Sequence, residues 1–304
     1  MAIGRRSSTL HQGYGPFLLP GLLLVGLVVG VPFLTNVAVS FTRWTGVGWP
    51  RWVGLANYRR AFADATFWAS FENNVILILA VTVIPTLLGL AIAVLLYDTV
   101  ARRFGAGPVS LLKAGLYLPQ VLPVAVAGVV WGWILDPSGG ALNAALRAVG
   151  LPGLTRSWLG DPGTALPSVM GIMVWFQLGY PLVIFMSAVQ RIDPQLLEAA
   201  ELDGARWRHR LHLISHLIRP EILVVVLTTT IYALKLFGPI YVLTRGGPGK
   251  ATIVPSYFAY QNFFEKAQVG YGAAISTLMT LVILALTAVF IRVQARQERR
   301  AEGG

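Results

Sequence analysis

Long apolar runs separated by shorter polar segments dominate the pattern of this chain. Six runs fall at residues 17–40, 75–97, 111–135, 166–189, 222–242 and 271–293. A bilayer core roughly 30 Å thick is crossed by about 20 apolar helical residues, and only helices or closed barrels satisfy every backbone polar group in lipid. The runs are too long and too unbroken for barrel strands. The pattern therefore predicts an all-α integral membrane protein with six transmembrane helices.

The composition agrees with an integral membrane protein. Of the 304 residues, 55% are hydrophobic and 12% are charged, and the mean hydropathy is +0.66, which a soluble domain would not tolerate on its surface. The absence of cysteine excludes disulfides and thiolate metal sites. The first run is longer than the apolar core of a cleaved signal peptide, so we expect a retained helix. Arg5 and Arg6 then form a topogenic flank rather than a twin-arginine export signal.

The basic residues predict an orientation. An even number of spans places both termini on one side, and fourteen Lys and Arg residues fall in the segments on that side against nine on the other. Because cytoplasmic segments carry the excess of positive charge, we expect a multi-pass protein with cytoplasmic tails at 1–16 and 294–304. We expect residues 17–293 to form a six-helix transmembrane domain. No nucleic-acid partner is expected, since no basic stripe is interleaved with aromatic residues on a soluble face.

Three connections, at 41–74, 136–165 and 190–219, are long enough to carry structure. The last is predicted to be cytoplasmic. Asp193 can cap a helix that begins with Pro194, and Asp203 with Gly204 offers a turn before a basic helical stretch at 205–218, which Pro220 closes. The segment 190–219 is therefore predicted to form a helix, a bend and a second helix outside the bilayer.

Residues 198–205, which read EAAELDGA, resemble the EAA loop of binding-protein-dependent ABC importers. The sequence is most similar to the carbohydrate-uptake class typified by maltose-system permeases. In that family the loop forms coupling helices that sit in a cleft of the ATPase subunit. The resemblance implies that Glu198 contacts the ATPase, while Ala199, Ala200 and Gly204 permit close approach and the bend. The full set expected in this coupling loop is Glu198, Ala199, Ala200, Asp203, Gly204 and Ala205.

Other motifs in the same order extend the resemblance over nearly the whole chain. They are VGLANY at 53–58, LP at 118–119 followed by Trp131, Gly140 and Asn143, YVLTRGGP at 241–248, and GYGAA at 270–274. The resemblance implies the type I ABC importer permease (MetI-like) fold. The chain departs from the family where a proline of the loop is replaced by His216, and where the spacing from Gly204 to Trp207 is one residue shorter.

The resemblance also implies an assembly. The chain would pair with a second, similar permease, with two ATPase subunits that bind ATP and Mg, and with an extracytoplasmic solute-binding protein. It would perform no chemistry, hold no cofactor or metal, and pass a disaccharide, oligosaccharide or related solute by alternating access. We therefore expect a transport subunit and not an enzyme.

A glycine-rich segment follows the fifth run. The sequence GGPGK at 246–250 looks like part of a phosphate-binding loop, but Thr244 stands where the first glycine is needed and Ala251 replaces the hydroxyl residue. We expect instead an outer turn in which Gly246, Gly247 and Pro248 contact the solute-binding protein.

Polar residues interrupt the fourth and fifth runs and mark a candidate substrate pathway. Hydroxyl, amide and aromatic groups recognise sugars by hydrogen bonds and by stacking, but small and polar residues equally pack membrane helices together. Both interpretations stay open. Lys235 lies inside the fifth run, where a charge lines the pathway, reaches the interface or pairs with a partner subunit. The candidates are Gln177, Gly179, Tyr180, Thr229, Tyr232, Lys235 and Leu236.

Two other classes of protein fit the sequence less well. An ion-coupled secondary transporter would place acidic residues inside its spans, whereas Glu72, Asp98, Asp136, Glu221 and Glu265 fall at edges or in loops. A membrane enzyme would need a convergent set of titratable residues near the membrane plane, and we identify none in the sequence.

A metal site on the cytoplasmic loop is a further alternative. His209, His212 and His216 lie on one face of a predicted helix. Arg208 and Arg210 adjoin them and would repel a cation, so a surface that faces solvent or a partner is favoured.

Overall fold

The computed structural model describes residues 15–302 and is mostly helical. Contacts divide the chain into two compact units. The first comprises Met1–Ala63 with Ala259–Leu278, and the second comprises Asp64–Phe258 with Met279–Gly304. Each unit is described by itself.

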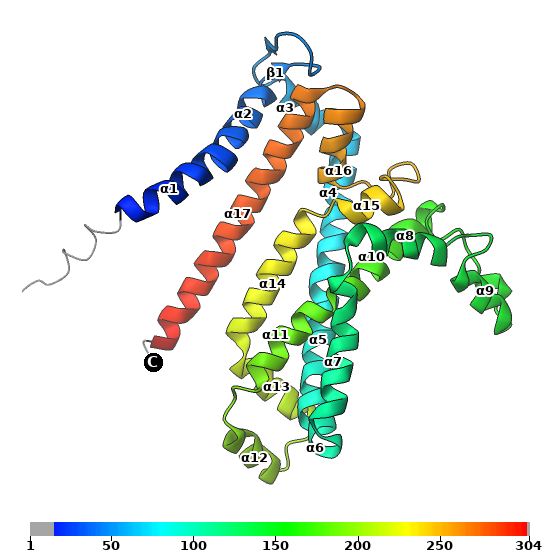
Figure 1. The fold of residues 1–304 in the computed structure, drawn as a ribbon, viewed down its shortest axis with the longest axis vertical. Helices are drawn as coiled ribbons and strands as arrows, with labels where there is room; N and C mark the ends of the chain where they lie inside the picture. The colour runs from blue at the N-terminus through cyan, green and yellow to red at the C-terminus, as the bar shows by residue number, and fades with distance from the viewer. Residues whose placement is uncertain (1–14, 303–304) are drawn as a thin grey trace, which may run out of the picture. The chain divides into compact units, whose positions relative to one another are not determined.

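The first unit contains an apolar helix, a small hairpin and the start of the last helix (Figure 1). The stretch Phe17–Ser40 is helical. None of the residues in its most apolar 18-residue segment is buried within the chain, as expected for a surface that faces lipid. In the hairpin, Thr42 pairs with Trp52 and Arg43 with Arg51. The elements that begin in this unit, and α16, which leads into it, are α1 (Gly15–Val25), η1 (Gly26–Gly30), α2 (Val31–Ser40), β1 (Thr42–Arg43), β2 (Arg51–Trp52), α3 (Ala56–Ala63), α16 (Pro255–Tyr260), η5 (Gln261–Glu265) and α17 (Val269–Glu302).

The second unit is a helical bundle in which α5 (Ile84–Leu95), α7 (Ala106–Val121), α11 (Gly179–Val189) and α14 (Arg219–Leu234) lie side by side (Figure 1). Its apolar core includes the fully buried Leu182 and Phe185. Its elements are α4 (Ala65–Ile78), η2 (Leu79–Val83), α5 (Ile84–Leu95), η3 (Leu96–Val100), α6 (Ala101–Phe104), α7 (Ala106–Val121), α8 (Val124–Ile134), α9 (Ala141–Ala148), η4 (Pro152–Leu154), α10 (Pro162–Gln177), α11 (Gly179–Val189), α12 (Pro194–Leu202), α13 (Trp207–Leu217), α14 (Arg219–Leu234) and α15 (Gly238–Leu243).

The predicted membrane runs correspond to long apolar helices. Within the described residues, four helices are long and apolar enough to cross a membrane: Phe17–Ser40, Ala65–Leu95, Pro162–Val189 and Val269–Val293. Two bent pairs raise the number to as many as six, α7 with α8 at 97° and α13 with α14 at 76°. The chain is thus an all-α membrane protein, as the sequence predicts.

The second membrane helix begins earlier than the apolar run at 75–97 indicates. Asp64 caps α4, accepting a hydrogen bond of 2.7 Å from the Thr66 N–H. The polar residues Glu72, Asn73 and Asn74 are therefore helical and not part of a connection. Asn74 is 2% exposed, and its side-chain amide donates to the Ala233 carbonyl at 3.1 Å. The start predicted from the apolar run alone is wrong because a partner on α14 satisfies this buried amide.

Two predicted spans are broken helices. The run at 111–135 bends at Leu122 and Pro123, because proline disfavours helical geometry in the residue before it and lacks an N–H. The run at 222–242 ends as a helix at Leu234, and α15 begins at Gly238. Lys235 is the exposed residue that ends α14, so its predicted place inside a continuous span is wrong.

The terminal segments are partly described. Residues 1–14 of the predicted tail at 1–16, including Arg5 and Arg6, lie outside the described residues. The tail at 294–304 continues α17 as a helix to Glu302.

Candidate functional site

The loop at 190–219 folds as the sequence predicts. Asp193 accepts a hydrogen bond of 3.0 Å from the Gln195 N–H and so caps α12. At the other end the Ala205 N–H donates to the Ala200 carbonyl at 2.9 Å and the Gly204 N–H to the Glu201 carbonyl at 3.0 Å. This pattern is a Schellman ending, in which Gly204 takes a positive φ of 76° that a glycine adopts without strain.

The second helix of the loop is tied back to the first. Nη1 of Arg210 on α13 lies 3.5 Å from Oε2 of Glu201 on α12. The Arg210 side chain is 17% exposed and that of Glu201 is 50% exposed, so the ion pair is partly open to solvent. The bend at Gly204 is thus closed by both backbone and side-chain contacts.

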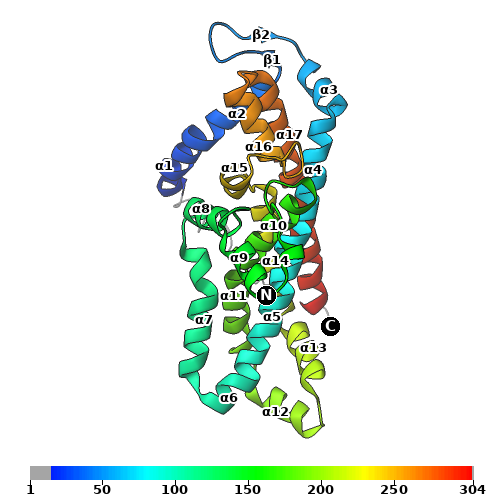
Figure 2. The same cartoon turned by 90° about the vertical axis from the view of Figure 1, so that its right-hand side faces the viewer.

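The inner face of the loop is packed into the bundle. Leu197, Ile214 and Ile218 are 4%, 1% and 2% exposed and belong to the same apolar cluster as Val94 and Phe185. Both views place α12 and α13 at the end of the unit where α6 lies (Figures 1 and 2). Burial of this kind stabilises a side chain by about 1.5–3 kcal/mol each, so the two helices are attached firmly to the bundle.

The outer face of the loop carries the predicted motif. Glu198, Ala199, Asp203 and Gly204 are exposed, and Ala200 and Ala205 are half-buried. Leu202 is 89% exposed at the end of α12. A large exposed apolar side chain beside small residues, on a firmly attached helix, is suited to contact with a partner.

An ion pair at the base of the loop joins the two helices that lead into and out of it. Nη2 of Arg191, after α11, lies 2.6 Å from Oε1 of Glu221 at the start of α14. Both residues line a cavity of about 230 Å³ with Ile192 and Leu217. The pair therefore joins the end of α11 to the start of α14 at the base of the loop.

The three histidines of the loop do not assemble into a metal site. Within residues 15–302 no group of three or more His, Asp or Glu side chains is placed to hold a metal ion. Nδ1 of His209 instead accepts a hydrogen bond of 3.3 Å from the Arg206 N–H, at the start of α13.

Among the pathway candidates, Gly179 and Tyr180 connect helices. A Cβ at Gly179 would lie 2.7 Å from Cα of Tyr117, so the glycine lets α11 approach α7 closely. The Tyr180 hydroxyl lies 3.0 Å from the Thr228 hydroxyl and links α11 to α14. Both residues thus have packing roles in this chain.

The remaining pathway candidates differ in burial and in hydrogen bonding. The Thr229 hydroxyl donates to the Val225 carbonyl of its own helix at 2.8 Å, Leu236 is 2% exposed, and Tyr232 is half-buried. Lys235 is exposed. Gln177 is 4% exposed, and its Oε1 has no hydrogen-bond partner among the described residues. A buried acceptor without a hydrogen-bond partner costs about 1–3 kcal/mol. Gln177 is therefore the candidate whose side chain most clearly lacks a hydrogen-bond donor.

Sequence reasoning missed a set of buried hydroxyl residues on the second span. Thr82 and Thr86 are 4% and 5% exposed. The Thr82 hydroxyl lies 3.5 Å from that of Thr230 on α14, and Oγ1 of Thr86 has no hydrogen-bond partner among the described residues. Their spacing of four residues within an apolar run places them on one helix face and could have identified them.

The segment predicted to contact a solute-binding protein is a tight turn. Gly246 has φ of 78° and packs against the ring of Tyr257, where a Cβ would lie 3.1 Å away. The Gly247 carbonyl accepts 2.7 Å from the Thr252 hydroxyl, and Gly247 and Pro248 are half-buried. The turn has a fixed backbone with part of its surface open.

Two motifs that are far apart in sequence meet in the first unit. The Asn57 amide of VGLANY donates to the carbonyls of Ser40 and Thr42, each at 2.8 Å. Gly270 of GYGAA lies so close to Thr42 that a Cβ would fall 1.9 Å from its carbonyl oxygen. These motif residues therefore position the hairpin against the start of α17.

Comparison of the sequence with known proteins identifies relatives along almost the full length. The family described as "Binding-protein-dependent transport system inner membrane component" matches residues 110–303. A probable ABC transporter permease protein of Pyrococcus horikoshii is 34% identical over 93% of this chain and 96% of its own length. The trehalose/maltose transport system permease protein MalF of Thermococcus litoralis is 31% identical over 91% of each chain.

The fold is also similar to that of solved structures. A chain of a bacterial ABC transporter involved in the import of the acidic polysaccharide alginate superposes with a TM-score of 0.80 and 20% identity, covering 92% of this chain and 94% of that chain. A second structure of the alginate transporter, in complex with an alginate pentasaccharide-bound periplasmic protein, gives a TM-score of 0.77. At this level of identity the similarity shows a shared fold.

Proposed function

The chain belongs to the family of binding-protein-dependent transport system inner membrane components, and from this premise we propose that it passes a disaccharide, an oligosaccharide or a related solute across the bacterial cytoplasmic membrane. It is an ABC transporter permease subunit, a transport component and not an enzyme. Relatives named for trehalose and maltose, for starch degradation products and for diacetylchitobiose support the sugar class. Family membership does not support the ion-coupled alternative.

One observation carries the proposed mechanism, the attachment of α12 and α13. Their inner face is buried through Leu197 and Ile214, while Glu198, Ala199 and Leu202 face outward. We propose that an ATPase subunit binds this outer face. Closure of two ATPases on ATP and Mg would then move the loop, and the Arg191 to Glu221 ion pair at its base would pass the motion to α11 and α14.

The proposed assembly follows from the same premise. A second, similar permease completes the pathway, and a solute-binding protein delivers substrate at the turn formed by Gly246, Gly247 and Pro248. The loop at 190–219 and both termini lie on the cytoplasmic side in this proposal. The excess of basic residues in those segments supports this orientation.

The proposed pathway lies where α4, α5, α10 and α14 present buried polar atoms. Oε1 of Gln177 and Oγ1 of Thr86 lack partners among the described residues, and a sugar hydroxyl would supply the missing donor or acceptor. Gly179, Tyr180, Thr229, Tyr232, Lys235 and Leu236 remain candidates by their place on or beside the same helices.

Deletion of this chain in its native host tests the function. We expect the deletion to abolish uptake of at least one labelled sugar in a panel of disaccharides, oligosaccharides and polyols, and the wild-type chain to restore it. The restored uptake should stop when ATP is depleted and persist when an ionophore dissipates the ion gradient. Unchanged uptake of every sugar in the panel, or uptake that responds only to the ionophore, would contradict the proposal.

A further inference from the structure

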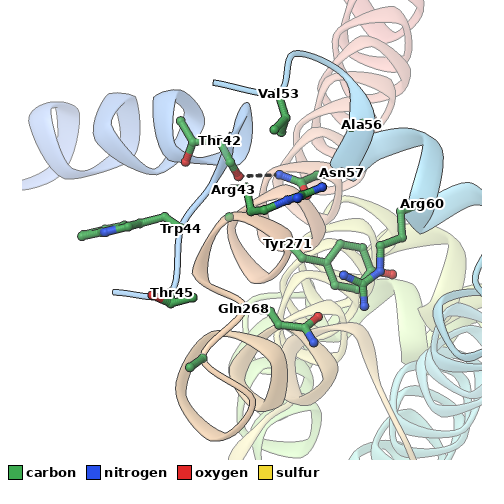
Figure 3. Close-up of a pocket in the computed structure, with 12 residues that line it drawn as sticks. Thr42, Arg43, Trp44, Thr45, Val53, Ala56, Asn57, Arg60, Gln268 and Tyr271 are labelled. Carbon is green, nitrogen blue, oxygen red and sulfur yellow. Dashed lines mark hydrogen bonds between the residues drawn. The ribbon is translucent and has the colours of Figure 1, made fainter. Parts of the chain in front are cut away.

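A cavity of about 380 Å³ lies within the first unit, between the β1 and β2 hairpin, the start of α3 and the segment that leads into α17 (Figure 3). Its volume is in the range of small-molecule sites. None of its lining residues is a candidate for the transport pathway or the coupling loop. Its polar and aromatic lining includes Arg43, Trp44, Asn57, Arg60, Gln268 and Tyr271.

The walls of this cavity are held by hydrogen bonds. The two bonds from the Asn57 amide fix the chain at Ser40 and Thr42. The Val53 N–H donates to the Phe41 carbonyl at 2.8 Å, and the Trp44 indole N–H donates to the Gly48 carbonyl at 2.9 Å. The cavity is therefore formed before any ligand binds, which lowers the cost of binding.

The charge of the cavity is positive. The guanidinium carbon of Arg60 lies 4.0 Å from the centroid of the Tyr271 ring, and Figure 3 shows the side chain reaching across that ring. Contact through the face of a guanidinium leaves the N–H groups on its edge open to a ligand. Arg43 lines the same cavity, and its lining contains no carboxylate. Neither arginine forms an ion pair within the described residues.

An unpartnered amide defines the second requirement on a ligand. Oε1 of Gln268 is buried and has no hydrogen-bond partner in the part of the chain that the structure describes. A hydroxyl group can donate to this oxygen, whereas an ionised carboxylate only accepts. The ring of Trp44 adds an aromatic surface of the kind that stacks on C–H faces.

We propose that this cavity binds a hydroxylated carboxylic acid of the sugar-acid type. Its carboxylate accepts hydrogen bonds from Arg43 and Arg60, and one of its hydroxyls pairs with Gln268. An Asp or Glu side chain of a docked protein supplies the carboxylate but not the hydroxyl, so the observations favour a small molecule. The site is separate from the proposed pathway and does not depend on the transport function.

Calorimetric titration of the full-length chain in lipid nanodiscs with D-glucuronate tests the proposal. We expect saturable binding that is at least about tenfold weaker for Arg60→Gln and for Arg43→Gln, since each loses hydrogen bonds to a charged group. Arg59→Gln is the matched control, because Arg59 is the neighbour of Arg60 on α3 and does not line the cavity. Gln268→Leu should weaken glucuronate and leave acetate unchanged.

Three results would overturn the proposal. They are the absence of saturable glucuronate binding, binding of D-glucose as tight as that of D-glucuronate, and equal weakening by Arg59→Gln, which would indicate diffuse attraction. Circular dichroism identifies any variant that fails to fold. Because Arg43 and Arg60 are replaced in separate variants, the test remains valid if one of the two fails to fold. Since this binding needs neither ATP nor a partner chain, its failure would leave the importer proposal intact.

Discussion

Oε2 of Glu201 lies 3.5 Å from Nη1 of Arg210, so an ion pair joins the two helices of the 190–219 loop across the bend at Gly204. The same bend is closed by the backbone bonds from Ala205 to Ala200 and from Gly204 to Glu201. The direction of α12 relative to α13 is therefore set by the bend itself, and the first prediction concerns the residue at its centre.

Gly204→Val should abolish uptake while membrane insertion stays intact. A β-branched residue at φ of 76° is strained by roughly 1–2 kcal/mol, and open space around the Cβ position limits the effect to the backbone of the bend. Gly204→Asn is the control, because asparagine tolerates this conformation. Sugar uptake and the amount of chain in membranes measure the outcome. Normal uptake in Gly204→Val would show that the bend is not needed for coupling.

Leu202→Glu should weaken binding of the ATPase without destabilising the fold. Leu202 is 89% exposed, so the free energy of unfolding should change by less than about 0.5 kcal/mol, while co-purification of the ATPase should be lost. Leu197→Ala is the opposite case, because Leu197 is 4% exposed and its truncation should cost about 2–5 kcal/mol. Thermal unfolding and pull-down measure the two effects. Full retention of the ATPase by Leu202→Glu would remove this face as the binding site.

Gly179→Ala should force α7 and α11 apart. The new Cβ would lie 2.7 Å from Cα of Tyr117, and overpacking of this kind costs about 1–3 kcal/mol. Gly171→Ala in α10 is the matched control, since no atom lies within 4 Å of its Cβ position. Thermal unfolding in detergent should show a lower midpoint for Gly179→Ala alone. Equal midpoints would contradict the close packing of these two helices.

Asn143→Leu should loosen the segment at 136–165. Asn143 is 1% exposed, its amide donates to the Arg156 carbonyl at 2.9 Å, and its Oδ1 accepts 2.8 Å from the Trp158 indole N–H. Each buried partner left unsatisfied costs about 1–3 kcal/mol, so limited proteolysis should cut this segment faster. The exposed Arg147→Gln on the same helix should leave the rate unchanged. A variant as resistant as the wild type would show that Asn143 does not hold the segment.

Local sequence signals predicted much of this fold. Apolar runs located the membrane helices, and Asp193 with Gly204 located both ends of α12, because capping and positive φ depend on neighbouring residues. Long-range contacts could not be found in this way. The helical state of Asn74 depends on a carbonyl of Ala233, and the roles of Asn57 and Gly270 depend on Thr42.

In the candidate site, too, local structure was predicted from the sequence and features that depend on long-range contacts were not. The loop at 190–219 is a local structure, and its helix, bend and second helix were predicted from its own residues. The pathway candidates were chosen for polarity, but Thr229 satisfies its hydroxyl within its own helix, and Lys235 lies at a break that Gly238 and Pro239 follow. The polarity of a residue in an apolar run does not reveal whether its side chain finds a hydrogen-bond partner within the chain. Thr86 and Gln177 each have a side-chain oxygen that lacks such a partner among the described residues.

Mass spectrometry of what co-purifies with the tagged chain from gently solubilised native membranes tests the central claim most directly. We expect a second, similar permease together with an ATPase, and we expect the Leu202→Glu variant to retain the permease and lose the ATPase. Recovery of the wild-type chain alone, with uptake that an ionophore abolishes and ATP depletion does not, would contradict the assignment as an ATP-driven importer.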